Sequence, residues 1–207
     1  MDEARQVREF WFGKLPLTGQ ALTQRVKLWF PEDTHPEDLK KLDGMIRSRF
    51  GPLMLRAAEG ALASWAGSPR RCLSLIILLD QFPRNIFRGT ARAFATDQQA
   101  LEATLSGMQS AADAALDVVE RLFFYMPLQH SEVREVQDES VAAYRRLLTE
   151  APEELRGIFA ESLQWAEKHR LLIEKFGRFP HRNQVLRRAN TPEEDVWLRT
   201  TTDRMGQ

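Results

Sequence analysis

The stretch SPRRCLSLIILLDQFPRNIFRG, residues 68–89, joins a strongly apolar run to a cluster of polar residues. Ser68 and Pro69 are residue types that favour the N-cap and the first position of a helix. The leucines and isoleucines that follow, as far as Leu79, leave no polar face, which predicts a helix buried on all sides. Pro83 is expected to break or kink that helix, because proline has no amide hydrogen to donate.

Helix signals recur on both sides of this stretch, and no segment shows the sustained two-residue alternation of a strand. Capping patterns and helix-ending glycines mark where the helices begin and end. Thr34 with Glu37, and Thr191 with Glu194, have the spacing of a capping box, and Gly51 and Gly177 are expected stops. The other predicted helices are residues 7–12, 34–50, 52–58, 96–105, 117–126, 131–148, 152–176 and one that begins at 191.

The arrangement of these segments predicts an all-α fold of about eight or nine antiparallel helices joined by short turns. No linker or low-complexity tract divides the chain, so residues 1–207 are expected to form one domain. A loop is expected from Gly13 to about Pro31. Trp29 and Phe30 in that loop are the leading candidates for an exposed apolar patch.

The charge and cysteine content restricts the possible partners. Lysine plus arginine and aspartate plus glutamate are both 29, so no global field attracts nucleic acid or an anionic membrane surface. We find no secretory h-region and no apolar run of membrane-spanning length. Cys72 is the single cysteine and is expected to be a buried thiol, which excludes an internal disulfide. A reducing cytoplasm is the expected location.

Two polar segments share one sequence pattern, in which a phenylalanine and a proline are followed by arginine and asparagine. The first Phe-Pro segment is residues 80–89 and the second is residues 176–183, with one histidine inserted. We expect them to meet in space. A helix that ends at Gly177 and another that begins near Pro180 would direct free amide groups to one place, which suits an anion.

A third polar segment extends from Glu120 to Glu132 and contains His130. Glu120 lies among valine, leucine and phenylalanine, so it is expected to be buried and paired with an arginine. His169 lies in the apolar stripe of its helix and is expected to be a hydrogen-bonded core histidine. His35 is expected at the surface beside a helix cap.

Three hypotheses of function follow from these segments. The first is a pocket that binds a small anionic molecule, because arginine gives planar, bidentate contacts to carboxylate or phosphate. The second is an interaction scaffold whose helices offer a groove to a peptide or a partner protein. The third is a packing network that fixes one arrangement of the helices.

The candidate residues belong to the first hypothesis. The ligand-binding candidates are Asp80, Gln81, Arg84, Asn85, Arg88, Glu120, Glu132, His169, Arg178, Arg182 and Asn183. If the site is catalytic, His130 and His181 are the candidates for proton transfer. No metal site is predicted, because no His-Glu-x-x-His pattern or close histidine pair occurs. The sequence indicates no particular cofactor.

The same motifs resemble a known family. Trp11-Phe12-Gly13, the stretch from Leu79 to Arg88, Ala93 to Asp97, Glu120 to Glu132 and His169 to Asn183 are similar to the bacterial domain-of-unknown-function 924 family. The resemblance covers nearly the whole chain and implies a helical, tetratricopeptide-like superhelix. It implies no particular activity. The alanine-rich stretch from Ala111 to Ala115 departs from the family pattern without touching a motif position.

Overall fold

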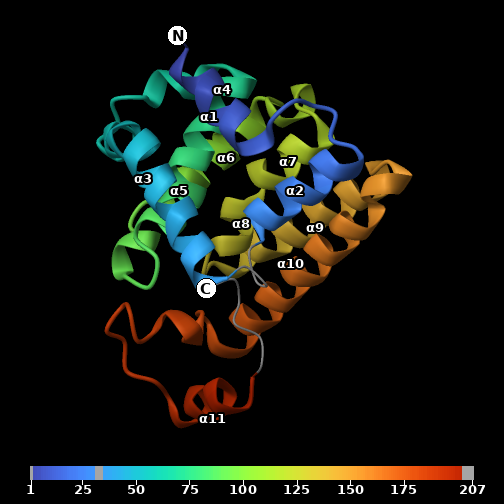
Figure 1. Ribbon diagram of the computed structural model, residues 1–207. Coiled ribbons are helices and arrows are strands. Elements are labelled where there is room, and N and C mark those ends of the chain that lie inside the picture. Colours follow the sequence, from blue (N-terminus) through green and yellow to red (C-terminus); the bar gives the residue numbers. More distant parts are fainter. Residues whose placement is uncertain (1, 31–34, 202–207) are drawn as a thin grey trace.

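The computed structural model describes residues 2–30 and 35–201, and every regular element within them is helical (Figure 1). The α-helices are α1 Glu3–Phe12, α2 Gly19–Trp29, α3 Pro36–Ala58, α4 Pro69–Ile76, α5 Phe82–Ile86, α6 Asp97–Gln109, α7 Val118–Phe124, α8 Met126–His130, α9 Arg134–Glu150, α10 Arg156–Phe176 and α11 Pro192–Thr200. A π-helical turn, Ile77–Gln81, joins α4 to α5. Short 3-10 turns occupy Ala63–Gly67, Ala91–Phe94, Asp113–Ala115, Glu153–Leu155 and Pro180–Arg182. Nine of the described α-helices have at least seven residues, which confirms the predicted all-α fold.

The stretch that contains α4, the π turn and α5 lies at the centre of the core, as its composition predicts. Residues 72–79 are all buried. α4 packs against α1, α6 and α7. Aromatic rings from distant segments pack together in this core. Trp11 contacts both Phe82 and Phe123 edge to face, at 5.7 and 5.6 Å between ring centroids.

The chain stays helical at Pro83, although the regular α-helix that the sequence predicted as far as Leu79 ends at Ile76. The chain widens into the π turn instead, where the amide of Phe82 donates to the carbonyl of Ile77. A regular helix would pair residue 83 with the carbonyl of Leu79, and proline cannot make that bond. The hydroxyl of Thr96 donates to this carbonyl at 2.5 Å. Thr96 therefore satisfies the backbone at the proline and does not cap α6 with its side chain.

The N-terminal part corrects two further expectations. Residues 19–29, predicted as loop, form α2, and Trp29 is buried with its indole nitrogen 3.0 Å from the carbonyl oxygen of Trp11. Of the predicted exposed patch, only Phe30 is exposed, at 39%. α3 continues through Gly51 and Pro52, because the carbonyl that Pro52 leaves unbonded belongs to exposed Ser48. Thr34 and Pro31 lie outside the described residues.

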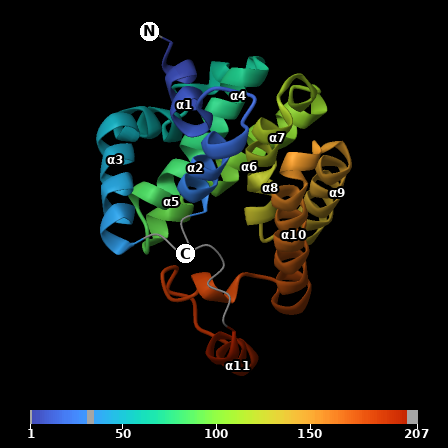
Figure 2. The ribbon, with the colours of Figure 1, turned by 45° about the vertical axis from the view of Figure 1, so that its right-hand side comes forward.

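The C-terminal part separates into a helix pair and a short tail segment. α9 and α10 pack side by side and antiparallel (Figures 1 and 2). α10 ends at Gly177, whose φ of 68° is the left-handed conformation that the sequence predicted for a stop. Residues 178–201, here called the C-terminal segment, lie at the end of the molecule where α10 stops (Figure 2).

The C-terminal segment has a small apolar cluster of its own. Phe179 packs with Leu172 and Ile173 of α10, apart from the main core, and Trp197 of α11 covers them. The predicted capping box of α11, from Thr191 and Glu194, is present. None of the helices in residues 2–30 and 35–201 combines the length and the apolarity that a membrane span needs.

Candidate functional site

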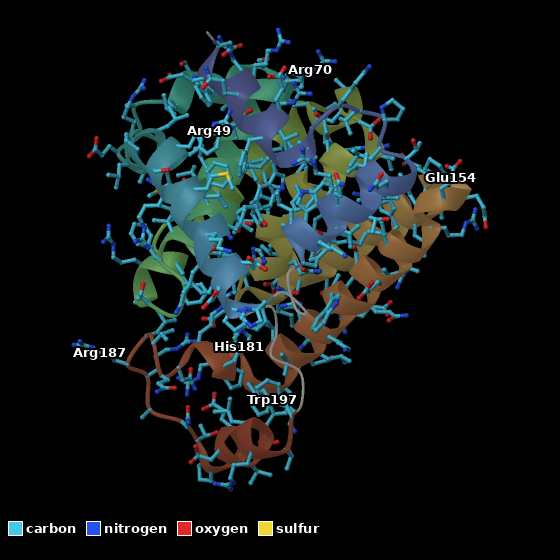
Figure 3. The ribbon with its side chains drawn as sticks, in the orientation of Figure 1. Arg49, Arg70, Glu154, His181, Arg187 and Trp197 are labelled. Atoms are coloured by element: carbon cyan, nitrogen blue, oxygen red, sulfur yellow. The ribbon has the colours of Figure 1, made fainter. Side chains whose placement is uncertain are left out.

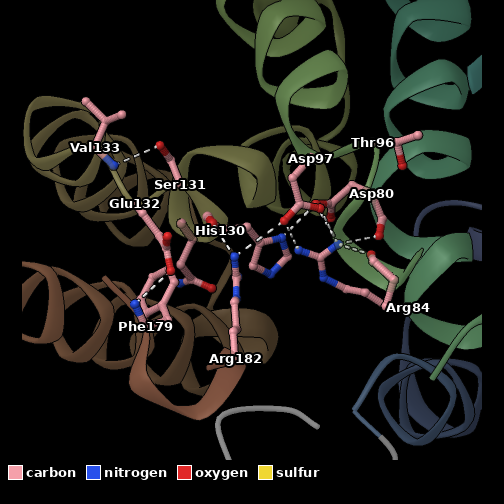
Figure 4. Close-up of polar contacts among 12 residues, drawn as sticks. Asp80, Arg84, Thr96, Asp97, His130, Ser131, Glu132, Val133, Phe179 and Arg182 are labelled. Atoms are coloured by element: carbon pink, nitrogen blue, oxygen red, sulfur yellow. Dashed lines mark hydrogen bonds and ion pairs between the residues drawn. The ribbon is translucent and has the colours of Figure 1, made fainter. Parts of the chain in front are cut away.

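The two Phe-Pro segments meet at Asp97, the first residue of α6, which confirms the prediction that they lie together (Figure 4). Arg84 of the first segment places two guanidinium nitrogens on the two Asp97 oxygens, at 2.8 and 3.1 Å. Arg182 of the second segment reaches the same carboxylate more distantly, with Nη1 3.5 Å from Oδ2. Asp97 therefore links the segments, a role that its position at a helix start did not reveal.

Asp80 and His130 form a buried pair beside this junction. The Asp80 carboxylate has no exposed surface, and its Oδ1 lies 2.7 Å from His130 Nδ1. Gln81 donates its amide to the other carboxylate oxygen. Burial alone would raise the pKa of Asp80, but the charge of Arg84 and the contact with His130 hold it below its ordinary value. Burial and Arg84 lower the pKa of His130, so the imidazole is neutral at neutral pH.

Arg182 is a buried cation with incomplete compensation. The residue is 6% exposed, its Nη1 donates to the carbonyl of His130 at 3.1 Å, and its Nε has no partner among the described residues. The guanidinium lies over the rings of Phe94 and Phe179, at 4.7 and 4.5 Å from their centroids. Burial and the charge of Arg84 lower its pKa to about 10. The one carboxylate in contact with it, Asp97, lies 3.5 Å away, so the charge of Arg182 is only partly compensated.

Two more histidines lie within the electrostatic reach of Arg182. His169 donates from Nδ1 to the carbonyl of Trp165 at 2.8 Å, which confirms it as a hydrogen-bonded core histidine. The Nδ1 of His181 is buried without a partner in the described part of the chain. Burial and nearby positive charge lower the pKa of each imidazole to about 3. Both rings are therefore neutral over the physiological range.

Two carboxylates hold the second Phe-Pro segment in place. Glu132 accepts the amide of Phe179 at 2.8 Å and both terminal nitrogens of Arg188, at 2.7 and 3.0 Å. Glu194 accepts two nitrogens of Arg178, both at 2.7 Å, and this hydrogen bonding lowers the pKa of Glu194 to about 2. The side-chain amide of Asn183 also donates to Glu194, at 3.3 Å. Arg188 and Glu194 were not among the predicted site residues.

Other predicted site residues have partners other than Asp97. Arg88 and Asn85 both bind Asp43 of α3, at distances of 2.9 to 3.0 Å. Glu120 is buried and paired with an arginine, as predicted, but that arginine is Arg8 of α1. Glu120 also completes the capping box of α7. These side chains are already occupied by local partners, so they do not extend the cluster at Asp97.

A small cavity lies within the C-terminal segment. It has a volume of about 330 Å³ and is lined by Pro180, His181, Gln184, Arg188, Asn190 and Leu198. His181 lies where this segment approaches the helical body (Figure 3). In the described part of the chain, eight buried side-chain polar atoms lack a partner, and four of them belong to residues 181–188. These four are His181 Nδ1, Arg182 Nε, Asn183 Oδ1 and Arg188 Nε.

Metal binding has no support in the same region. No group of three histidine, cysteine, aspartate or glutamate side chains able to hold an ion occurs within residues 2–30 and 35–201. Cys72 is buried in the core, and burial raises the pKa of its thiol to about 11.

The fold and the cluster at Asp97 define an all-helical protein whose polar site lies where the C-terminal segment meets the helical body. The chain belongs to the family described as bacterial protein of unknown function (DUF924), whose sequence model matches residues 7–202. A solved structure of a protein of unknown function from Agrobacterium tumefaciens is 33% identical, with a TM-score of 0.71. The match covers 86% of this chain and 97% of that one. No curated protein matches the sequence.

Proposed function

We propose that the protein binds a small oxyanion, a phosphate or a carboxylate, beside Arg182. The observation that carries this proposal is the incomplete compensation of the buried Arg182 guanidinium. Its one carboxylate contact is 3.5 Å long, and its Nε lacks a partner within the described residues. A buried cation is costly unless it is paired, and guanidinium groups bind carboxylate and phosphate through charge-assisted hydrogen bonds.

The surroundings of Arg182 support the same ligand class. Arg188 Nε and His181 Nδ1 are further buried atoms without a partner in the described part of the chain, and both residues line the cavity of the C-terminal segment. A volume of about 330 Å³ lies at the lower end of the range for ligand pockets, which favours a small molecule over a peptide. Arg84 contributes positive charge but is not free to bind, because Asp97 occupies its guanidinium.

The two alternative functions explain less of this region. A packing network accounts for the bidentate pairs of Arg84, Arg178 and Arg188, but it requires no unpartnered guanidinium nitrogen. An interaction scaffold would need a continuous apolar surface. The large exposed apolar side chains that the structure describes come from separate segments and are Phe30, Met45, Leu55, Val133, Leu171 and Val196.

Calorimetric titration with inorganic phosphate and with citrate tests the proposal. We expect at least one of them to bind the wild-type protein and to raise its melting temperature. Arg182→Met, which keeps a long side chain without the charge, should abolish both effects. Arg145→Met is the matched control, because Arg145 is an exposed arginine that pairs with Glu167 at 3.2 Å. Binding that survives in Arg182→Met would place the anion elsewhere, and absence of binding by the wild type would reject the proposal.

A further inference from the structure

The Asp80–His130 pair is fixed in orientation by several hydrogen bonds. Asp80 lies in the π turn, and such turns are frequent at functional sites. One carboxylate oxygen accepts from His130 and the other from Gln81, so the carboxylate is fixed in orientation. His130 is the last residue of α8, and its carbonyl accepts from Arg182. Both the ring and the backbone of His130 are therefore fixed.

This geometry determines which ring nitrogen of His130 carries the hydrogen. An ionised carboxylate only accepts hydrogen bonds, so the Nδ1 beside Asp80 must be the N–H of the neutral imidazole. Nε2 is then left with its lone pair. It makes no hydrogen bond to any residue that the structure describes, while 15% of the side-chain surface is exposed. His130 thus combines a fixed tautomer with a free, accessible acceptor atom.

The ring of His130 lies beside Arg182. The imidazole of His130 lies between the guanidinium groups of Arg84 and Arg182 (Figure 4). Four charged groups face it: Asp80 from the π turn, Arg84 from α5, Asp97 from α6 and Arg182 from the C-terminal segment. An oxyanion bound to Arg182 would therefore lie close to Nε2.

His181 is less suited to accept a proton, although the sequence singled out both histidines. Its Nδ1 is buried without a partner in the described part of the chain, and no carboxylate contacts its ring. The charges near it are those of Arg182 and Arg188, which oppose protonation. His130 has Asp80 at 2.7 Å to stabilise an imidazolium.

We propose that His130 is the proton-accepting residue of the anion site and that the ligand is an oxyanion that still carries an acidic hydrogen, such as a phosphate monoester monoanion. This inference rests on the proposed anion binding at Arg182. The ligand O–H bond breaks, and the proton binds to Nε2 of His130. The electron pair stays on the ligand oxygen, which gains one negative charge between Arg84 and Arg182. The positive charge of the imidazolium is balanced by Asp80, a positioning residue.

Nitrogen-15 NMR of the histidine rings, with inorganic phosphate as the probe, tests the inference. In the free protein at neutral pH we expect His130 to carry its hydrogen on Nδ1 and to have an unprotonated Nε2. Saturating phosphate should protonate Nε2 and raise the pKa of His130 by about 1 to 3 units, the usual effect of a nearby opposite charge. His35, which is exposed, is the internal control that should not respond.

Two variants separate the possible outcomes. Arg182→Met should remove the phosphate response of His130 but leave its tautomer unchanged. Asp80→Asn keeps an acceptor oxygen without the charge, so the phosphate-bound pKa of His130 should be lower than in the wild type. If Asp80→Asn does not fold, the tautomer and the titration of His130 in the wild-type protein still test the proton-accepting role.

The failures of the two proposals are distinguishable. If phosphate perturbs Arg182 and His181 but leaves Nε2 of His130 unprotonated, or if the free protein carries the hydrogen on Nε2, the proton-transfer role is wrong and anion binding survives. If phosphate perturbs none of these groups, the binding proposal itself fails.

Discussion

Arg84 and Arg182 lie on either side of Asp97, and their contacts predict opposite effects when each is replaced by methionine. Arg84 binds both Asp97 oxygens and the carbonyl of Asp80, and its Nη1 lies 3.4 Å from Asp80 Oδ1. Arg84→Met therefore leaves the fully buried Asp80 and the largely buried Asp97 without their main cation. Breaking a buried ion pair on one side costs about 3 to 5 kcal/mol of unfolding free energy.

Arg182→Met removes much less. The guanidinium contributes a long contact to Asp97 and one hydrogen bond to a carbonyl, and it repels Arg84. Loss of its position over the rings of Phe94 and Phe179 costs about 2 kcal/mol for a desolvated cation, and the methionine sulfur recovers part of that against the rings. Relief of the buried charge acts in the opposite direction. We expect a net change within about 1 kcal/mol of zero.

Urea unfolding at pH 7 measures the unfolding free energy of both variants. The transition is monitored by tryptophan fluorescence, and the m-values are compared with that of the wild type. The expected order is a large loss for Arg84→Met and a small change of either sign for Arg182→Met. If Arg182→Met is as destabilising as Arg84→Met, then Arg182 is a member of the packing network and the reasoning for an anion site is wrong.

Three further changes test other parts of the structure. Glu120→Ala should lower the unfolding free energy by about 2 to 4 kcal/mol, because it strands Arg8 and removes a helix cap, and a double-mutant cycle with Arg8→Ala measures the coupling. His169 has a folded pKa of about 3 against about 6.5 unfolded, so only the unfolded chain gains its proton as the pH falls below 6.5. Stability should fall by about 2 kcal/mol between pH 6.5 and 5 through this residue, and His169→Phe should lack that part of the pH dependence in urea titrations. Gly107→Ala should destabilise by about 1 to 3 kcal/mol in thermal unfolding, because its Cβ would lie 2.5 Å from a phenylalanine ring carbon, whereas Gly44→Ala in open space on α3 should stabilise slightly.

Local signals in the sequence were sufficient where the cause of the structure is itself local. Gly177 ends α10 in the left-handed conformation that glycine favours, and Thr191 caps α11 through a spacing of three residues. The run before Leu79 is buried because no polar face is available to solvent. α2 was missed although Leu22, Val26, Leu28 and Trp29 all pack in or against the core and Leu22, Val26 and Trp29 have helical spacing.

The partners of the arginines could not be read from the polar segments, because they come from elsewhere in the chain. Asp43 binds Arg88 and Asn85 from α3, and Asp97 binds Arg84 from α6. Which acid meets which arginine is decided by tertiary packing. The surplus of arginine within the Phe-Pro segments is therefore largely neutralised. Of the two arginines at Asp97, Arg84 is therefore expected to be needed for stability, whereas Arg182 is not.

The charge on Arg182 shows why a count of charges is a weaker guide than their geometry. Around the junction, Arg84, Arg182 and Arg188 face Asp80, Asp97 and Glu132, so the formal charges balance. The contact distances show that the three arginines are not compensated equally. Arg84 takes both oxygens of Asp97, and Arg188 takes both oxygens of Glu132, which leaves Arg182 with a single contact of 3.5 Å. Coulomb energy falls with distance and burial removes the screening by water, so this one guanidinium remains under-compensated within a formally neutral cluster.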